Sequence, residues 1–192
     1  MAATQKIELP ALSIQTITLM LIGDSPLIVH AWSEKAKRQM LEKQMKKASK
    51  GKEAKDPEAD YEACFYRTEG GGYGFPAIGV KAAMVAAARY VDAKMTVLRG
   101  AFHIDCEMLP VIGEPRPRED MVRVGMGTAD IRYRPEFPEW RIPATIKFNT
   151  AAISAEQIAN LLNVAGFGVG IGEWRPERNG QYGRFHVGSD GE

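Results

Sequence analysis

Cysteine, histidine and long apolar runs are all scarce in this sequence of 192 residues. Its two cysteines, Cys64 and Cys106, form no CxxC pair, so we expect free thiols in a reducing compartment and neither a disulfide framework nor a zinc site. No stretch approaches the roughly 20 apolar residues that a membrane-spanning helix needs. The first residues lack the pattern of a signal peptide. We therefore expect a soluble, cytoplasmic protein with no membrane partner.

The motifs of metal and nucleotide chemistry are missing as well. The sequence contains no HExxH and no paired-carboxylate pattern, and its glycine-rich segment lacks the GK[ST] ending of a Walker motif. Histidine can act as a general acid or base, and His30 follows the first apolar segments. No catalytic partner for it can be placed from sequence. We expect no cofactor, no metal and no catalytic residue, and hence a protein that is not an enzyme.

Neither sign of charge is in excess. The 25 Lys and Arg residues nearly balance 24 Asp and Glu residues, which gives a formal net charge of +1. Proteins that coat duplex DNA by bulk charge are strongly basic, so this class is excluded, whereas a local basic groove is not. The hydrophobic fraction of 45% can fill a core. The length predicts a single domain over residues 1–192.

The apolar segments predict an α+β fold. The continuous apolar and β-branched run at 16–22 indicates a strand near the centre of a sheet. Ser154 and Gln157 form a capping box at the start of the last helix, and an earlier apolar helix begins near Ile78. Further strands are expected at 27–30, 61–67, 101–112, 140–148 and 182–187. Without insertions, the order is β-α-β-β-α-β, the ferredoxin-like (RRM-like) arrangement, whose open sheet face often binds single-stranded nucleic acid.

Two segments are expected to project from this core. Residues 33–60 have the composition of a basic helix with a thin apolar stripe, followed by a polar tail, and predict a helical and mobile insertion. Residues 113–138 are rich in proline and arginine and contain strand-like pieces, which predicts a protruding β-hairpin. Both segments carry cations that are able to contact a bound strand or a neighbouring subunit.

The last quarter of the chain carries the most informative pattern, four glycines at alternate positions. Glycine loses the most conformational freedom on ordering, so such a loop is kept where the backbone passes close to something or turns where side chains clash. An exposed backbone beside an indole and three guanidinium groups suits a phosphate-bearing strand. In the alternative interpretation the tryptophan anchors the loop and the arginines pair with nearby glutamates. The segment contains Gly166, Gly168, Gly170, Gly172, Trp174, Arg175, Arg178 and Arg184.

Three segments, in this order, resemble the RAMP superfamily, whose members form guide-RNA-binding and processing subunits of CRISPR effector complexes. They are TITLMLIGDSPLIVH, GFPAIGVKAAMVAAA and the glycine-rich GFGVGIGEWRPERNGQYGRF. The resemblance implies a modified RNA-recognition fold, a thumb formed by the hairpin, and subunits that polymerise head to tail along RNA. The chain is shorter than a typical backbone subunit. A stand-alone relative, such as one carried by a bacterial virus, therefore fits as well, and its strand could be single-stranded DNA.

The residues predicted to bind nucleic acid are cations and glycines from four places in the chain. For the cations the competing explanations are a solvated helix face, a lysine stem lying along the surface, and cross-strand pairing with Glu119, Asp120, Asp130 and Glu136. The predicted set is Lys35, Lys37, Arg38, Lys81, Arg116, Arg118, Arg123, Arg132, Arg134, Gly168, Gly170, Gly172, Trp174, Arg175, Arg178 and Arg184.

The sequence thus favours non-catalytic binding of single-stranded RNA or DNA by a subunit that stacks head to tail into a filament or effector complex. Two other hypotheses stay open. One is a RAMP-type endoribonuclease that uses His30. The other is a structural or assembly protein of a virus particle.

Overall fold

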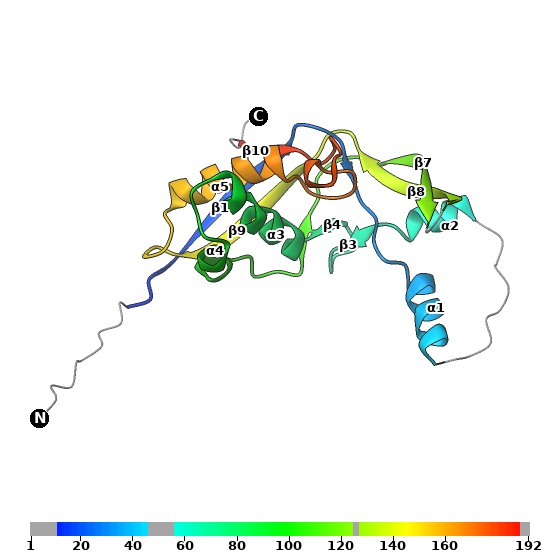
Figure 1. The fold of residues 1–192 in the computed structure, drawn as a ribbon, viewed down its shortest axis with the longest axis horizontal. Helices are drawn as coiled ribbons and strands as arrows, with labels where there is room; N and C mark the ends of the chain where they lie inside the picture. The colour runs from blue at the N-terminus through cyan, green and yellow to red at the C-terminus, as the bar shows by residue number, and fades with distance from the viewer. Residues whose placement is uncertain (1–10, 46–55, 125–126, 189–192) are drawn as a thin grey trace, which may run out of the picture.

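The computed structural model describes residues 11–45, 56–124 and 127–188. The architecture is α+β, with a four-stranded antiparallel sheet, two three-stranded sheets beside it, and helices packed on the larger sheet (Figure 1). Within the described residues, none of the helices is both long enough and apolar enough to cross a membrane.

The four-stranded sheet has the order β10-β1-β9-β5, and each neighbouring pair is antiparallel. Along the chain, one core helix lies between β1 and β5 and another between β9 and β10. This order is compatible with the predicted β-α-β-β-α-β core. The elements are β1 (Ile14–Gly23), α3 (Ala77–Ala87), β5 (Phe102–His103), β9 (Arg141–Asn149), α5 (Ala155–Gly168) and β10 (Phe185–Gly188).

One face of this sheet is buried and the other is not. Along β9, Ile142 and Ile146 are buried while Arg141 and Thr145 are exposed, the alternation of a half-covered strand. Helices α3 and α5 belong to the same hydrophobic core as the buried residues. The apolar run at 16–22 forms β1, which lies between β10 and β9 as expected of a strand near the centre of a sheet. The strand lies inside the sheet, but only Leu21 is fully buried, because its other face has no covering layer in the described part of the chain.

The predicted start of α5 is confirmed. The Ser154 hydroxyl accepts a hydrogen bond from the Gln157 backbone N–H (3.2 Å), and the Gln157 side chain accepts one from the Ser154 N–H (2.9 Å). The helix continues to Gly168, so the expectation that Gly166 and Gly168 lie in a loop is wrong. A Cβ at Gly166 would lie 1.8 Å from the Phe185 carbonyl oxygen. This glycine therefore allows α5 to pack closely on β10.

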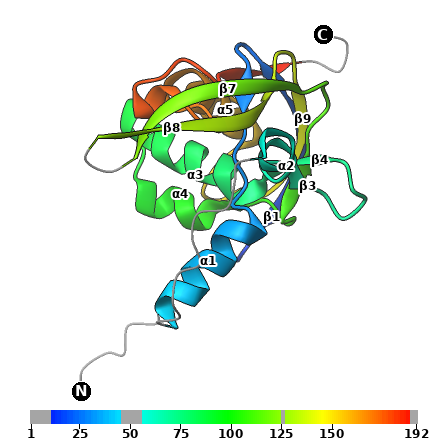
Figure 2. The ribbon, with the colours of Figure 1, turned by 90° about the vertical axis from the view of Figure 1, so that its right-hand side faces the viewer.

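The two smaller sheets extend the body beyond the core. In the first, β7 (Arg116–Val124) and β8 (Thr128–Phe137) pair as an antiparallel hairpin within the segment 113–138, and β2 (Leu27–Ile28) joins β8. The base of the hairpin is buried around Phe137, whereas its far end reaches past the helices (Figure 2). The second sheet consists of β3 (Tyr66–Arg67), β4 (Tyr73–Pro76) and β6 (Met108–Pro110).

Several local expectations need correction. The segment 61–67 was expected to be a strand, but Asp56 caps a helix that ends at Glu62, its carboxylate accepting the Ala59 N–H at 3.1 Å. The expected strand at 101–112 is divided into β5 and β6. Helix α1 extends away from the body (Figure 1), and residues 46–55 of the predicted insertion lie outside the described residues. The remaining elements are α1 (Glu34–Gln44), α2 (Pro57–Glu62), η1 (Ala88–Tyr90), α4 (Met95–Ala101) and η2 (Pro176–Arg178).

Candidate nucleic-acid interface

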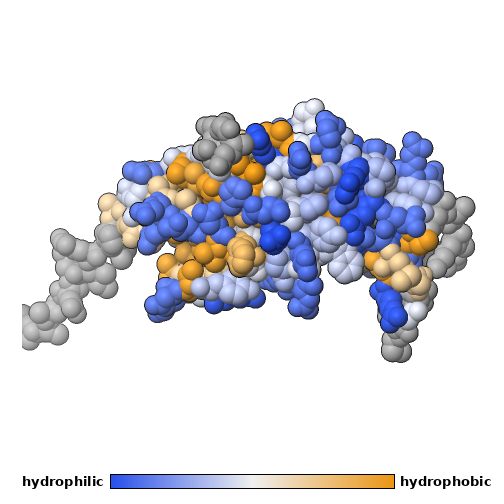
Figure 3. Space-filling view, turned by 90° about the horizontal axis from the view of Figure 1, so that it is seen from above, coloured by the Kyte–Doolittle hydropathy of each residue, from blue (hydrophilic) through white to orange (hydrophobic). Residues whose placement is uncertain are grey.

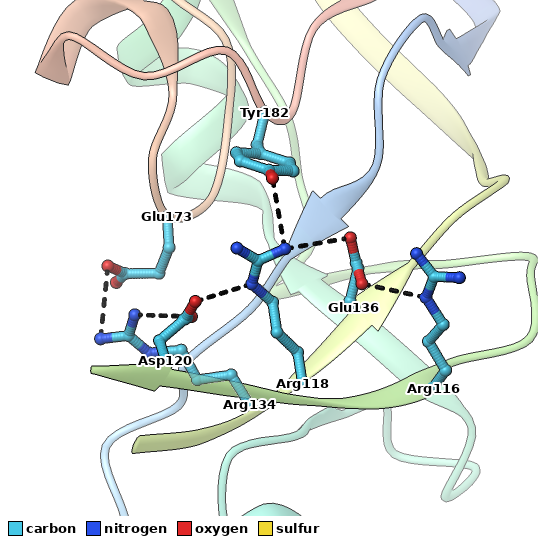
Figure 4. A network of polar contacts seen from close by, with 7 residues as sticks. All are labelled: Arg116, Arg118, Asp120, Arg134, Glu136, Glu173 and Tyr182. Carbon is cyan, nitrogen blue, oxygen red and sulfur yellow. Dashed lines mark hydrogen bonds and ion pairs between the residues drawn. The ribbon is translucent and has the colours of Figure 1, made fainter. Parts of the chain in front are cut away.

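A network of charged side chains ties the hairpin to the segment that follows α5 (Figure 4). Arg118 on β7 lies at its centre. Its Nε donates to Asp120 (2.8 Å), and its Nη1 donates to Glu136 (3.4 Å) and to the hydroxyl of Tyr182 (3.2 Å). Because Tyr182 belongs to the segment 169–184, this contact fixes the hairpin and that segment relative to each other.

The remaining members of the network balance its charge. Arg116 Nε donates to Glu136 at 3.0 Å, and Arg134 Nη1 donates to Asp120 at 3.3 Å. The second amino group of Arg134, Nη2, lies 4.0 Å from Glu173. Three guanidinium groups thus face three carboxylates (Figure 4), and the cluster presents little net charge to a polyanion.

The hairpin arginines therefore follow the pairing alternative more closely than the free-cation one. Arg132 also lies 3.0 Å from Asp130, whereas Arg123 is exposed and makes no ion pair within the described residues. Arg134 is only 6% exposed, and its Nε has no hydrogen-bond partner among the described residues. A buried donor without a partner costs free energy. Whether Arg116, Arg118, Arg123, Arg132 and Arg134 contact a strand stays a prediction.

Of the four glycines at alternate positions, Gly170 and Gly172 lie after α5, and both serve internal packing. Gly170 and Gly172 have φ values of 70° and 78°, in the left-handed region that favours glycine. A Cβ at Gly172 would lie 2.5 Å from the Ile28 carbonyl oxygen, and the next residue, Glu173, donates its N–H to that oxygen at 2.9 Å. The expectation of a glycine backbone open to a ligand is wrong here, because the chain itself occupies that space.

Trp174 has an unusual backbone. Its φ is 54°, although it carries a bulky side chain, and a non-glycine residue in this region costs about 1–2 kcal/mol. Its carbonyl oxygen accepts the Tyr182 N–H at 3.0 Å. A Cβ at Gly180 would lie 1.6 Å from the same oxygen. The backbone is therefore held on both sides, while the side chain remains 42% exposed.

Trp174 borders a hollow of about 400 Å³ between the hairpin and the segment 169–184, here called the arginine hollow. Arg175 is engaged at this rim, because it donates to Glu177 at 3.1 Å and to the Gly172 carbonyl at 3.1 Å. Arg178 is exposed and makes no ion pair within the described ranges, so its charge is available beside the indole. The hollow is lined by Val122, Arg134, Glu173, Trp174, Arg175 and Arg178.

A second hollow of about 320 Å³, the histidine cleft, shares Glu173 and Arg175 with the first. Its walls come from the end of β2, from β4, from the first turns of α3 and from the segment 169–173. His30 lies in this cleft, and burial, reinforced by the charge of Arg134, lowers its pKa. Tyr66 donates its hydroxyl proton to the His30 carbonyl at 3.2 Å. No pattern in the sequence predicts that Tyr66 lies beside His30.

The other predicted cations lie elsewhere. Lys81 Nζ is 3.1 Å from Nδ1 of His103 and lines neither hollow. Lys37 pairs with Glu34 at 2.5 Å on α1, and Arg38 is exposed on the same helix. Lys35 lies in α1 with a side chain outside the described part. Arg184 donates to the Gln181 carbonyl at 3.3 Å and also lies outside both hollows.

Hydrophilic and apolar side chains are unevenly distributed over the surface. Seen from above, hydrophilic side chains gather mostly over the end that carries the hairpin, and apolar side chains are concentrated toward the end that carries α5 (Figure 3). Of the sixteen predicted residues, Arg134, Trp174, Arg175 and Arg178 meet at the arginine hollow. Glu173 joins both hollows, although the sequence indicated it only as an ion-pair partner.

No protein-family model matches the chain, and the comparison with curated proteins gives no match. Among solved structures, the chain is similar to Cmr6 from Pyrococcus furiosus, with a TM-score of 0.46 and 11% sequence identity. The alignment covers 93% of this chain and 100% of that chain.

Proposed function

We propose that this protein binds single-stranded RNA or DNA at the arginine hollow without catalysing a reaction. The observation that carries the proposal is the exposed indole of Trp174 on a backbone in the left-handed region. Strained residues persist where the surrounding structure enforces them, and they concentrate at ligand sites. An exposed indole at such a residue offers a base a surface on which to stack.

The cations beside Trp174 support the same function. Arg178 is exposed without an ion pair in the described ranges, and Arg175 lines the same hollow although it pairs with Glu177. Guanidinium groups neutralise phosphates, and the release of counterions makes such binding fall steeply with salt. The charge-balanced network of the hairpin joins it to the segment 169–184 through Arg118 and Tyr182. The hollow lies between these two connected segments.

Fluorescence polarisation with labelled single-stranded RNA and DNA at low salt tests the proposal. Stacking on an aromatic side chain is worth about 1–3 kcal/mol per base, so Trp174→Ala should weaken binding roughly 5- to 150-fold. The matched control is Trp32→Ala, because Trp32 is 58% exposed and lies outside the arginine hollow. The proposal would be overturned if the protein bound neither RNA nor DNA, or if both substitutions weakened binding equally.

His30 is the specific reason to keep one enzymatic alternative, a RAMP-type endoribonuclease. The histidine lines a cleft next to the arginine hollow. Non-catalytic binding is favoured because the His30 imidazole makes no hydrogen bond to an acid or base within the described residues, and general acid–base catalysis needs a positioned group. Incubation with RNA separates the two functions. Cleavage that is lost in His30→Ala would replace the binding proposal with the ribonuclease.

We further propose that subunits line up head to tail along the strand, a heterologous contact that does not close on itself. The exposed apolar side chains of Met40 and Leu41 on the projecting helix α1 support this, because they have no covering layer within the described residues. Light scattering should show a particle mass that grows with strand length. Assembly of equal size without nucleic acid would instead favour the structural protein of a virus particle.

A further inference from the structure

We infer that the histidine cleft receives one unstacked base of the bound strand and selects guanine through the carboxylate of Glu173. This inference rests on the proposed function, since it requires a strand at the arginine hollow. The two hollows share Glu173 and Arg175, so a strand that stacks one base on Trp174 runs directly beside the opening of the cleft. Proteins commonly read single strands by splaying bases out of the stack.

The size and walls of the cleft suit a single base. Its volume of about 320 Å³ lies at the small end of the range for small-molecule sites. The cleft is lined by the buried Phe75 and by Ile78, whose side chain is 71% exposed, and the small residues Gly79 and Ala82 leave space on the α3 side. At Gly79 a Cβ would lie 2.8 Å from the Phe75 ring, so the glycine lets that ring sit against the helix. Flipped bases are held between aromatic and apolar groups of this kind.

The polar groups of the cleft are mostly satisfied by one another. Arg175 and Glu177 form an ion pair at 3.1 Å, and Glu177 also lies 3.6 Å from Arg89. The Tyr66 hydroxyl donates to the His30 carbonyl. Glu173 differs, because its carboxylate accepts no hydrogen bond within the described residues, and the nearest cation, Arg134, is 4.0 Å away. The long contact to Arg134 is thus an ion pair without a hydrogen bond, and both carboxylate oxygens of Glu173 can still accept hydrogen bonds from a ligand.

A free carboxylate discriminates between the bases by the donors on their Watson–Crick edges. Guanine presents two adjacent donors, N1–H and the N2 amino group, which match two carboxylate oxygens, whereas adenine, cytosine and uracil each present donors at only one position of that edge. Bidentate pairs with an ionised partner are the stronger and more selective hydrogen bonds. The His30 ring, kept neutral by burial, retains one N–H for the guanine O6 or N7 acceptor.

The test compares labelled oligothymidines that carry one central guanine or one central adenine. We expect roughly tenfold tighter binding of the guanine oligonucleotide, as for one good bidentate contact to a base. Glu173→Gln should abolish the ratio between the two affinities, because an amide has a single acceptor oxygen. The ratio is the quantity to follow, since removal of a negative charge near phosphates strengthens the binding of both strands alike. Glu62→Gln is the control, because Glu62 pairs with Arg67 at 3.1 Å and lies outside both hollows.

A second variant tests the cavity independently of the carboxylate. Ala82→Leu narrows the cleft from the exposed side of α3 and should also remove the guanine preference, whereas Ala59→Leu on the exposed face of α2 should not. Circular dichroism verifies that each variant is folded.

Equal affinity of the native chain for both oligonucleotides overturns this inference and leaves the proposed function standing. A guanine preference that persists in Glu173→Gln overturns the assignment to Glu173. Absence of binding to every oligonucleotide refutes the proposed function itself.

Discussion

The guanidinium carbon of Arg118 lies 4.8 Å from the centre of the Tyr182 ring, and Nη1 of the same arginine donates a 3.2 Å hydrogen bond to the Tyr182 hydroxyl. One residue is on β7 and the other just before β10, so the pair joins two segments that are distant in sequence. The cation–π contact and the hydrogen bond use different parts of the tyrosine. Two substitutions can therefore separate their contributions.

Tyr182→Phe should lower the free energy of unfolding by about 1 kcal/mol, because it removes one hydrogen bond and keeps the ring. Tyr182→Ala should cost more, since the cation–π contact and the packing of the ring are also lost. Urea denaturation measures both changes. Tyr61→Phe is the control, because the Tyr61 hydroxyl makes no hydrogen bond within the described residues. Equal stability of Tyr182→Phe and the native chain would show that the bond contributes nothing.

Loss of the ion pair between Asp120 and Arg134 should lower the free energy of unfolding by more than loss of the Tyr182 hydrogen bond does. Both side chains are 8% exposed, and removal of Asp120 leaves the buried Arg134 with only the 4.0 Å contact to Glu173. Asp120→Ala should therefore lower the free energy of unfolding by about 3–5 kcal/mol. The double variant Asp120→Leu with Arg134→Met should recover most of this loss, because an apolar pair has no desolvation penalty.

A double-mutant cycle by urea denaturation checks this prediction. The exposed pair Glu62 and Arg67, with 58% and 44% of their side chains accessible, should give a coupling below about 1 kcal/mol. If Asp120→Ala costs no more than Glu62→Ala, the hairpin network does not stabilise the fold.

The strained backbone of Trp174 predicts that glycine at this position gives a more stable protein than alanine, the reverse of the usual order. Trp174→Gly relieves the left-handed conformation, while Trp174→Ala keeps it, although both remove the indole. The glycine variant should be more stable than the alanine variant by about 1 kcal/mol in urea denaturation. Both variants should lose nucleic-acid affinity equally, so stability and binding separate. A more stable alanine variant would mean that the φ of this residue is not a source of strain.

Much of the fold follows from local sequence patterns. The capping box at Ser154 and the strand expected at 140–148 depend on neighbours that are close in sequence, and each is present as predicted. The helix α4 was missed, because a seven-residue helix with Gly100 as its last residue but one gives little periodic signal. The split of 101–112 into β5 and β6 depends on which sheet each strand joins, and no local pattern reports that.

The candidate site shows where local patterns end. Trp174 and Arg178 were predicted from their spacing in the glycine-rich segment, and they do line a hollow. The glycines beside them were misinterpreted, because Gly172 faces the Ile28 carbonyl across 144 residues of chain and not a ligand. The pairing of Arg118 and Arg134 with specific acids likewise depends on the hairpin register. The resemblance to the RAMP superfamily and the absence of catalysis stay predictions.

His30 predicts how stability depends on pH. Burial, and after it the charges of Arg134 and Arg132, lower its pKa below the ordinary value of 6.5, while Glu173 acts in the opposite direction. The unfolded chain then binds a proton more readily than the folded chain, so the stability contribution of the neutral imidazole is present above about pH 6.5 and is lost as the pH falls through the lower pKa of the folded state.

The free energy of unfolding of the native chain should therefore decline between pH 7 and pH 5 more steeply than that of His30→Gln. Urea denaturation of both chains over this range isolates His30, because all other titrating groups are shared, and parallel curves would contradict a half-buried imidazole with a lowered pKa. Glu173→Gln in the native background should make the decline steeper, since it removes the one nearby charge that favours the protonated ring.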